Sequence, residues 1–325
     1  MKQRLDYIDI AKGIGVLTVI YSHSGGENGL MTYIGGFFIP LFFVLSGITY
    51  SNRNDRFIDY TIRKFKHLIF PYAFFSVMLL VLYRHFSFVD ILGVFYSRYC
   101  LYPFSVSPNI HFMESGNAPM WFLTAMFVSL VLFRVLLDNE KKLYWIIGVY
   151  VIIIGLSAYL PILLPWSIDA AFLFSLFIYI GTKVKSVNYN KIGVLIFFLM
   201  LVLYFGICYC NGEPNLSVRE YGHSFILVLL TGTLGAIIVI KASQWLEKSY
   251  FKNVLMAFGQ HSLTIFCIQM LLLRMQNYLI FDIIELPLNT CTLYVTSVLK
   301  TILTACIGLY LSMGLKRYFP FIFKS

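Results

Sequence analysis

The feature that most constrains this chain is a succession of apolar runs separated by short polar segments. About ten of these runs are roughly 16–24 residues long, which is close to the length that a helix needs to cross a ~30 Å hydrocarbon layer. We therefore predict an all-α polytopic membrane protein with about ten transmembrane helices. The predicted spans are residues 8–24, 33–50, 68–84, 119–137, 143–160, 167–182, 192–210, 224–241, 254–274 and 292–315.

The composition agrees with a membrane protein and excludes an ordinary soluble domain. Hydrophobic residues make up 59% of the chain and charged residues 12%, with a mean hydropathy of +0.78, whereas a soluble domain has about 25% charged residues. The first run is not a cleaved signal peptide, because it contains Asp9 and Lys12 and a second run follows at once. The net charge of +10 does not indicate nucleic-acid binding, because the cations lie in separate short loops.

The distribution of basic residues predicts the orientation of the chain. Most of the 25 lysines and arginines lie in the N-terminal segment and in every second loop after it, so the positive-inside rule predicts that both termini are cytoplasmic. Residues 85–118 are interrupted by Asp90 and Arg98 and are expected to form an interfacial or re-entrant piece of an outer loop. Since no linker or internal repeat is visible, we predict one integral-membrane domain over residues 1–325.

The first predicted span contains ionisable residues, which are costly in hydrocarbon and therefore suggest a function. Lys12 and His23 are eleven residues apart, so they lie on nearly the same helix face, roughly 16 Å apart along the axis. They could hold two ends of an elongated ligand. The alternatives are that Asp9 and Lys12 form a structural ion pair at the cytoplasmic interface, with the lysine snorkelling, and that His23 is simply interfacial.

The second predicted span, in particular residues 35–47, combines small residues with a proline. Pro40 removes a backbone hydrogen bond and is expected to kink the helix. The glycines of this segment and Ser46 would allow another backbone or a ligand to approach closely, with ordinary helix packing as the alternative.

The loop over residues 52–67 is rich in cations and ends with Arg63, Lys64, Lys66 and His67. Such a cluster could bind the phosphates of a cytoplasmic cofactor. A juxtamembrane basic cluster also commonly fixes topology or contacts anionic lipid, and both interpretations stay open here.

Two acids are expected on the outer side, Glu114 in the long outer loop and Asp169 near the end of the sixth span. Either could contact a sugar or orient His23. The alternatives are a solvated loop for Glu114 and capping of a helix start for Asp169. We predict no metal site, because no two histidines have the spacing of ligands on one helix.

Several motifs, taken together in order and spacing, resemble the integral-membrane acyltransferase-3 family, whose members acylate cell-surface glycans. The family begins with a basic residue, ten residues and a histidine, and continues with Pro-Leu-Phe-Phe-x-x-Ser-Gly, a basic motif before Pro-Tyr, and a Trp-Phe-Leu element. The matching positions are Lys12 to His23, Pro40 to Gly47, Arg63 to His67 followed by Pro71 and Tyr72, Trp121 to Leu123, and Trp166 with Asp169.

The resemblance implies that acetyl-CoA or another acyl-CoA donates an acyl group to a sugar hydroxyl. His23 would be the general base on that hydroxyl, and an acyl-histidine intermediate is a variant. The further candidate catalytic residues are Asp9, Asp169 and Glu114. The donor would be bound by a set of mostly basic residues, namely Lys12, Arg63, Lys64, Lys66, His67 and Ser46.

The resemblance also implies the partners and the location. These are acyl-CoA, a lipid-linked or exported glycan and membrane lipids, with no nucleic acid, in a bacterial cytoplasmic membrane. The chain departs from the family in having Lys12 where arginine is common, Gln269 where many relatives have histidine, and two possible registers of the basic motif, Arg63-x-x-Lys66 and Lys64-x-x-His67. The alternative functions are a transporter or flippase for a lipid-linked saccharide and a non-catalytic relative that serves as an assembly partner.

Overall fold

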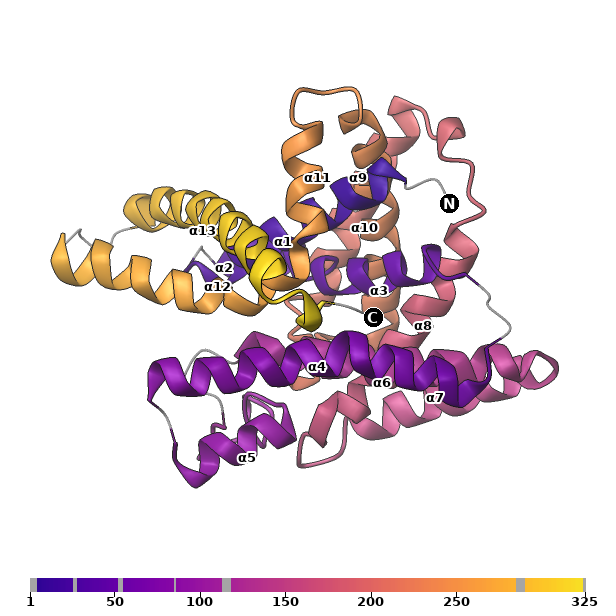
Figure 1. Ribbon diagram of the computed structural model, residues 1–325. Coiled ribbons are helices and arrows are strands. Elements are labelled where there is room, and N and C mark those ends of the chain that lie inside the picture. Colours follow the sequence, from indigo (N-terminus) through magenta and orange to yellow (C-terminus); the bar gives the residue numbers. More distant parts are fainter. Residues whose placement is uncertain are drawn as a thin grey trace.

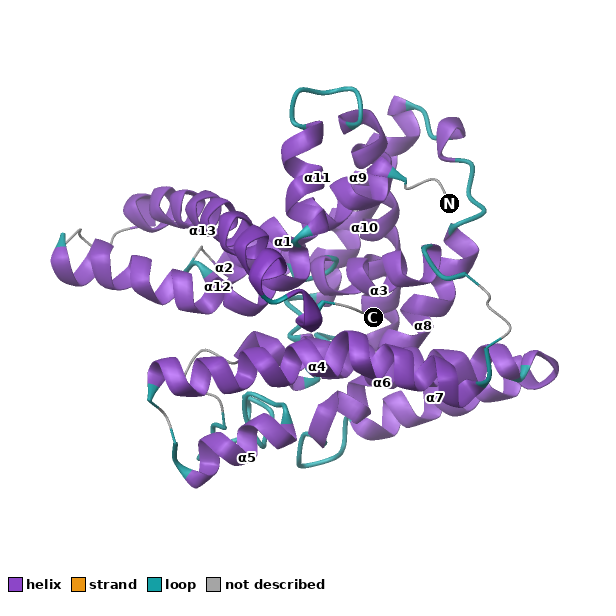
Figure 2. Cartoon of the chain, in the orientation of Figure 1, coloured by secondary structure: helices purple, strands orange, loops and turns teal. Residues whose placement is uncertain are grey.

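The computed structural model describes residues 5–25, 28–51, 55–84, 86–112, 118–284 and 290–323, and within these ranges the chain forms helices and no strand (Figure 2). This confirms the predicted all-α fold. The α-helices are α1 (Asp6–His23), α2 (Asn28–Ile34), α3 (Phe38–Ile48), α4 (Phe57–Tyr83), α5 (Phe88–Tyr96), α6 (Trp121–Asp138), α7 (Leu143–Ser157), α8 (Ile168–Val184), α9 (Val194–Asn211), α10 (Phe225–Leu246), α11 (Lys252–Gln260), α12 (Ser262–Asn277) and α13 (Thr290–Tyr318).

Each of the ten predicted spans coincides with one or two of these helices. Eight helical segments in the described ranges are long and apolar enough to cross a membrane, which confirms a polytopic membrane protein. Two of the predicted spans are not among these eight segments. They are α1, which carries Asp6, Asp9 and Lys12, and α7, which has 15 residues. Helix α5, within the predicted outer loop, has nine residues and is too short to cross a ~30 Å layer. The cytoplasmic location of the termini stays a prediction.

Helix α1 lies at the centre of the bundle. It contacts α3, α10, α11, α12 and α13. In Figure 1, α12 and α13 run side by side at the left, and α4 and α6 run together along the bottom. The helix that carries Lys12 and His23 is therefore surrounded by elements from both halves of the sequence.

Glycines set the closest helix crossings. A β-carbon on Gly259 of α11 would lie 1.8 Å from the carbonyl oxygen of Asp9 in α1, and one on Gly13 would lie 2.2 Å from the carbonyl oxygen of Leu255. Small residues permit such backbone contact between helices in a membrane, where packing and not the hydrophobic effect holds helices together. Helix α3 meets α8 in the same way, since a β-carbon on Gly47 would lie 2.0 Å from the carbonyl oxygen of Ile178. The predicted close approach at Gly47 is confirmed.

The structure corrects the predicted kink at Pro40. This residue lies in the first turn of α3, which begins at Phe38. The amide nitrogens of a first turn have no intrahelical partner, so proline interrupts nothing there. The predicted second span is instead interrupted before Phe38, where a turn over residues 35–37 separates α2 from α3.

The structure also corrects the predicted span over residues 254–274, which is formed by two helices instead of one. Helix α11 ends at Gln260 and α12 begins at Ser262, with His261 between them. The carbonyl oxygen of Gln260 accepts a hydrogen bond from Lys316 Nζ at 3.0 Å. Interrupted helices are tolerated in membrane proteins where the freed backbone groups find partners or line a cavity, and both conditions hold here.

Candidate active site

Two cavities lie on either side of the middle of α1. We name them by their key residues. The Lys12 cavity has a volume of about 640 Å³ and is enclosed by parts of α1, α3, α4, α6, α11, α12 and α13. The His23 cavity has a volume of about 490 Å³ and is enclosed by α1, α2, α3, α6, α12 and two segments outside the long helices, which contain residues 99–104 and 213–217. Lys12 and His23, eleven residues apart on α1, thus line different cavities.

The Lys12 cavity is strongly cationic. Its wall includes four cations, Lys12, Arg63, Lys64 and Lys316, and two histidines, His67 and His261. Asp9 is also in this wall and pairs with Lys12 at 3.8 Å. Gln260 Nε2 donates to Asp9 Oδ2 at 3.4 Å. The predicted Asp9–Lys12 pair is therefore present, and it lies at the edge of a cavity whose charge suits a polyanionic ligand.

The predicted donor-binding residues separate into two groups. Ser46 lines the Lys12 cavity together with the basic residues of α4 named above, and its Oγ donates to the carbonyl oxygen of Phe42 at 2.9 Å. Lys66 is exposed and lines neither cavity. Of the motif residues on α4, those that line the cavity are thus Arg63, Lys64 and His67, and Arg63 is also ion-paired with Asp55. This arrangement favours the Lys64-x-x-His67 register.

Two residues of this cavity were not singled out from the sequence. His261 lies at the break between α11 and α12 and is within 2.8 Å of Ser312 Oγ through its Nδ1 atom. Lys316 at the end of α13 lines the same cavity. The polar run Gly-Gln-His-Ser inside a predicted span was a possible signal for His261. Lys316 had none, because a lysine at the end of a span resembles any other topology-setting charge.

His23 is the last residue of α1, and its side chain is exposed to the cavity named after it. The neighbouring Ser22 Oγ lies 3.2 Å from His23 Nδ1 and donates its own proton to the carbonyl oxygen of Val19 at 2.8 Å. A serine hydroxyl has a single proton, so in this arrangement its oxygen accepts from His23 Nδ1–H. With that proton on Nδ1, the lone pair of His23 is on Nε2, which can then accept a proton.

The rest of the His23 cavity combines aromatic faces with polar groups. The aromatic side chains include Tyr99, Phe104 and Trp121, and the loop between α9 and α10 supplies Glu213 and Ser217. Burial raises the pKa of the Glu213 carboxyl above its usual range. A concave site with apolar walls and a few polar groups is typical of binding sites for small organic ligands.

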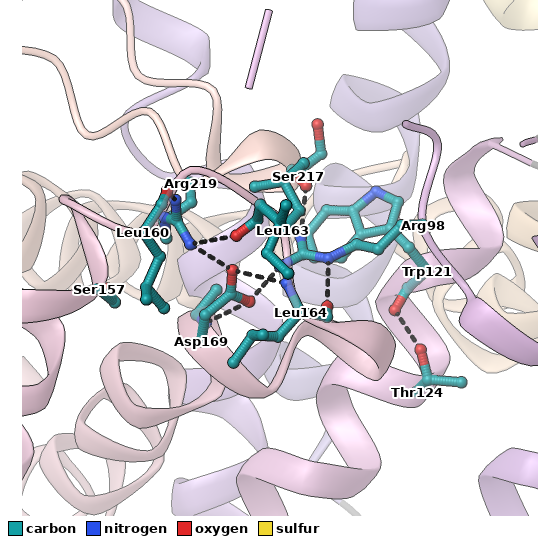
Figure 3. A network of polar contacts seen from close by, with 12 residues as sticks. Arg98, Trp121, Thr124, Ser157, Leu160, Leu163, Leu164, Asp169, Ser217 and Arg219 are labelled. Carbon is teal, nitrogen blue, oxygen red and sulfur yellow. Dashed lines mark hydrogen bonds and ion pairs between the residues drawn. The ribbon is translucent and has the colours of Figure 1, made fainter. Parts of the chain in front are cut away.

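Asp169 lies outside both cavities, in a buried polar network (Figure 3). Its carboxylate forms ion pairs with Arg98 and with Arg219, the latter at 2.8 Å, and all three side chains are at most 1% exposed. Arg98 Nη1 also donates to the carbonyl oxygen of Ser217 at 2.6 Å. Because Ser217 lines the His23 cavity, Asp169 supports the wall of that cavity and does not face its interior.

The candidate catalytic residues are therefore not gathered at one point. Among the described residues, His23 is the one candidate that reaches the His23 cavity. Asp9 is fourteen residues earlier in α1, ~21 Å away along the helix, and lines the Lys12 cavity. Glu114 lies outside the described residues.

Comparison with protein families identifies the class of protein that carries these cavities. The acyltransferase-3 family model, which is described as an acyltransferase domain, matches residues 5–317. The chain is thus a membrane acyltransferase, and it belongs to the acyltransferase-3 family, as the order of its motifs predicted. A search among curated proteins found no match.

Proposed function

We propose that this chain is a membrane O-acyltransferase that moves an acyl group, in the simplest case acetyl, from acyl-CoA to a sugar hydroxyl. The acceptor would be a surface or exported polysaccharide, such as O-antigen, capsule or exopolysaccharide, in a bacterial cytoplasmic membrane. The observation that carries the proposal is a cationic cavity and a histidine cavity that follow one another along one helix. A donor with an anionic nucleotide end and a long thin arm matches that pairing.

In this proposal the donor enters the Lys12 cavity, which faces the cytoplasm if the basic loops set the orientation. Its phosphates are bound by Lys12, Lys64 and the neighbouring basic residues of that cavity. The pantetheine arm follows α1 toward His23, and the thioester reaches the His23 cavity, where the acceptor hydroxyl binds among the aromatic and polar side chains of the wall.

In the proposed reaction His23 takes one proton from the acceptor hydroxyl and later gives it to the leaving thiolate. His23 Nε2 accepts the proton of the acceptor hydroxyl as the oxygen attacks the thioester carbonyl carbon. The carbon–oxygen bond forms, the carbon–sulfur bond breaks, and the departing thiolate takes the proton back from the imidazolium of His23. General base catalysis of this kind contributes about 10²- to 10⁴-fold to a rate.

The test compares the surface glycans of cells that carry the wild-type chain with those of cells that carry His23→Ala. The glycans are analysed by mass spectrometry before and after mild alkali. We expect an alkali-labile acyl mass with wild type and its loss with His23→Ala. His223→Ala is the matched control, since His223 lines neither cavity and its Nδ1 atom bonds to the carbonyl oxygen of Asn211 at 2.9 Å.

Retention of the acyl mass in the His23→Ala strain would exclude His23 as the base. An unacylated glycan in every strain, together with loss of glycan export when the chain is deleted, would favour the alternative of a transporter or flippase. Two cavities at different depths along one helix would also suit such a protein, so the covalent change on the glycan is the deciding observation. Acyl transfer by the purified protein would exclude a non-catalytic assembly partner.

A further inference from the structure

Two buried polar side chains on α12 make no hydrogen bond to any described residue. Thr264 is 1% exposed and its Oγ1 atom has no partner. Gln269 is fully buried, and neither its Oε1 nor its Nε2 atom has a partner. Buried polar groups in proteins nearly always have a partner, because leaving one without is destabilising. Two such side chains on one helix therefore point to a ligand that supplies their partners.

The hydroxyl of Thr264 differs from those of many serines and threonines in the helices of this chain. The hydroxyls of Thr18 and Ser46, for example, donate to a backbone carbonyl oxygen three or four residues earlier, which is the usual partner of such a group within a helix. The carbonyl oxygen four residues before Thr264 is that of Gln260, and it accepts from Lys316 Nζ at 3.0 Å. Thr264 does not make this bond, and it lines the Lys12 cavity.

The amide of Gln269 lies on the face of α12 that is turned toward α1. Ile265 and Leu273, one turn before and one turn after it, belong to a buried cluster that includes residues of α1. Gln269 is also three residues after Phe266, so the two side chains are neighbours on the helix surface. Phe266 lines both the Lys12 cavity and the His23 cavity. Gln269 is therefore near the level at which one cavity follows the other.

The two unpartnered groups are on either side of Phe266 along α12. At 1.5 Å per residue, Thr264 is ~3 Å before it and Gln269 ~4.5 Å after it. A donor with its anionic end in the Lys12 cavity and its thioester in the His23 cavity passes the residues that line both, of which Phe266 is one. The part of acyl-CoA between these two ends is the pantetheine arm, which carries two amide groups and a hydroxyl.

We propose that Thr264 and Gln269 bind the polar groups of the pantetheine arm. This inference rests on the proposed acyl transfer from acyl-CoA. The side-chain amide of Gln269 can accept from an N–H group of the arm or donate to one of its carbonyl oxygens, and the hydroxyl of Thr264 can do the same. Neither side chain takes part in proton transfer. They hold the arm along α12 so that the thioester reaches the His23 cavity.

The inference predicts opposite effects on donor binding and on stability. Gln269→Met keeps the length of the side chain and removes both unpartnered polar atoms, so the free protein is expected to unfold at the same or a higher temperature. The same variant removes a partner of the arm, so the Kd for CoA is expected to rise about fivefold. A residue with only a structural role would instead lose stability and leave the Kd unchanged.

The experiment measures CoA binding by calorimetry and thermal unfolding, both with the purified full chain in detergent. The variants are Gln269→Met and Thr264→Val. The control on the same helix is Gln276→Met, because Gln276 Nε2 donates to Thr304 Oγ1 at 2.9 Å and Gln276 lines neither cavity. Adenosine bisphosphate is the second probe, because it keeps the anionic end of CoA and lacks the arm.

We expect both variants to bind CoA about fivefold more weakly and to bind adenosine bisphosphate like wild type. Gln276→Met is expected to unfold at a lower temperature and to bind CoA like wild type. Wild-type affinity for CoA in either variant would overturn the assignment of that residue, as would an equal loss of affinity for both probes.

Failure of Gln269→Met to fold would show that Gln269 is structural, and Thr264→Val would still test the arm site. Absence of CoA binding and of acyl transfer by wild type would instead refute the proposed function.

Discussion

Replacement of Asp169 by asparagine is expected to destabilise the fold by about 3–5 kcal/mol, which is the typical penalty for breaking a buried ion pair. The carboxylate faces two guanidinium groups, of Arg98 and Arg219, and none of the three side chains is more than 1% exposed. Asparagine has nearly the same shape but no charge, so two cations would stay buried without their counter-ion. Since each 1.4 kcal/mol is tenfold, the ratio of folded to unfolded protein would fall by about 10²- to 4 × 10³-fold.

The assay is thermal and denaturant unfolding of the purified chain in detergent. Asp138→Asn is the matched control, because Asp138 pairs with Arg134 at 2.8 Å but is 36% exposed, and exposed pairs contribute about 1 kcal/mol or less. If the two variants lost equal stability, the argument from burial would be refuted. If Asp169→Asn unfolded like wild type but transferred no acyl group, Asp169 would be a catalytic residue and not a support of the cavity wall.

Two further predictions concern the cavities. Lys64→Ala should raise the KM for acyl-CoA by about tenfold through the loss of a charged hydrogen bond. Lys66→Ala should leave this KM unchanged because Lys66 lines neither cavity. Equal effects of the two variants in steady-state assays would contradict the Lys64-x-x-His67 register. Ser22→Ala should lower kcat by about fivefold, which corresponds to the loss of one hydrogen bond of about 1 kcal/mol, with little change in KM. Ser22→Thr should restore the wild-type kcat. A wild-type kcat in Ser22→Ala would show that the serine does not set the tautomer of His23.

The order of motifs was enough to predict the family, and the length of the apolar runs was enough to predict the helices. Both are local properties of the chain. A run of about 20 apolar residues forms a helix in lipid whatever lies beside it, because the backbone has no other partner for its hydrogen bonds. The spacing of Lys12 and His23 likewise predicted that the two side chains lie well apart on one helix face, since one helix fixes the distance between its own residues.

Breaks between two helices inside one predicted span could not be predicted from the length of the apolar runs. Pro40 resembled a mid-helix kink because the start of α3 was placed too early. The break at His261 depends on a lysine 55 residues later, Lys316, which binds the carbonyl oxygen of Gln260. In both cases hydropathy averages over a window that is wider than the break itself.

The sequence by itself therefore determined the class of protein, the helices and the histidine that lines the His23 cavity. Tertiary structure alone decided which side chains share a cavity, because this depends on where distant helices cross. The contacts at Gly13 and Gly259 bring α11 onto α1, and the two arginines that hold Asp169 come from loops 50 and 71 residues away. Lys66 could have bound a phosphate and Asp169 could have oriented a histidine, judged by residue type alone. The packing of their helices instead leaves Lys66 on the surface and buries Asp169 behind the wall of the His23 cavity.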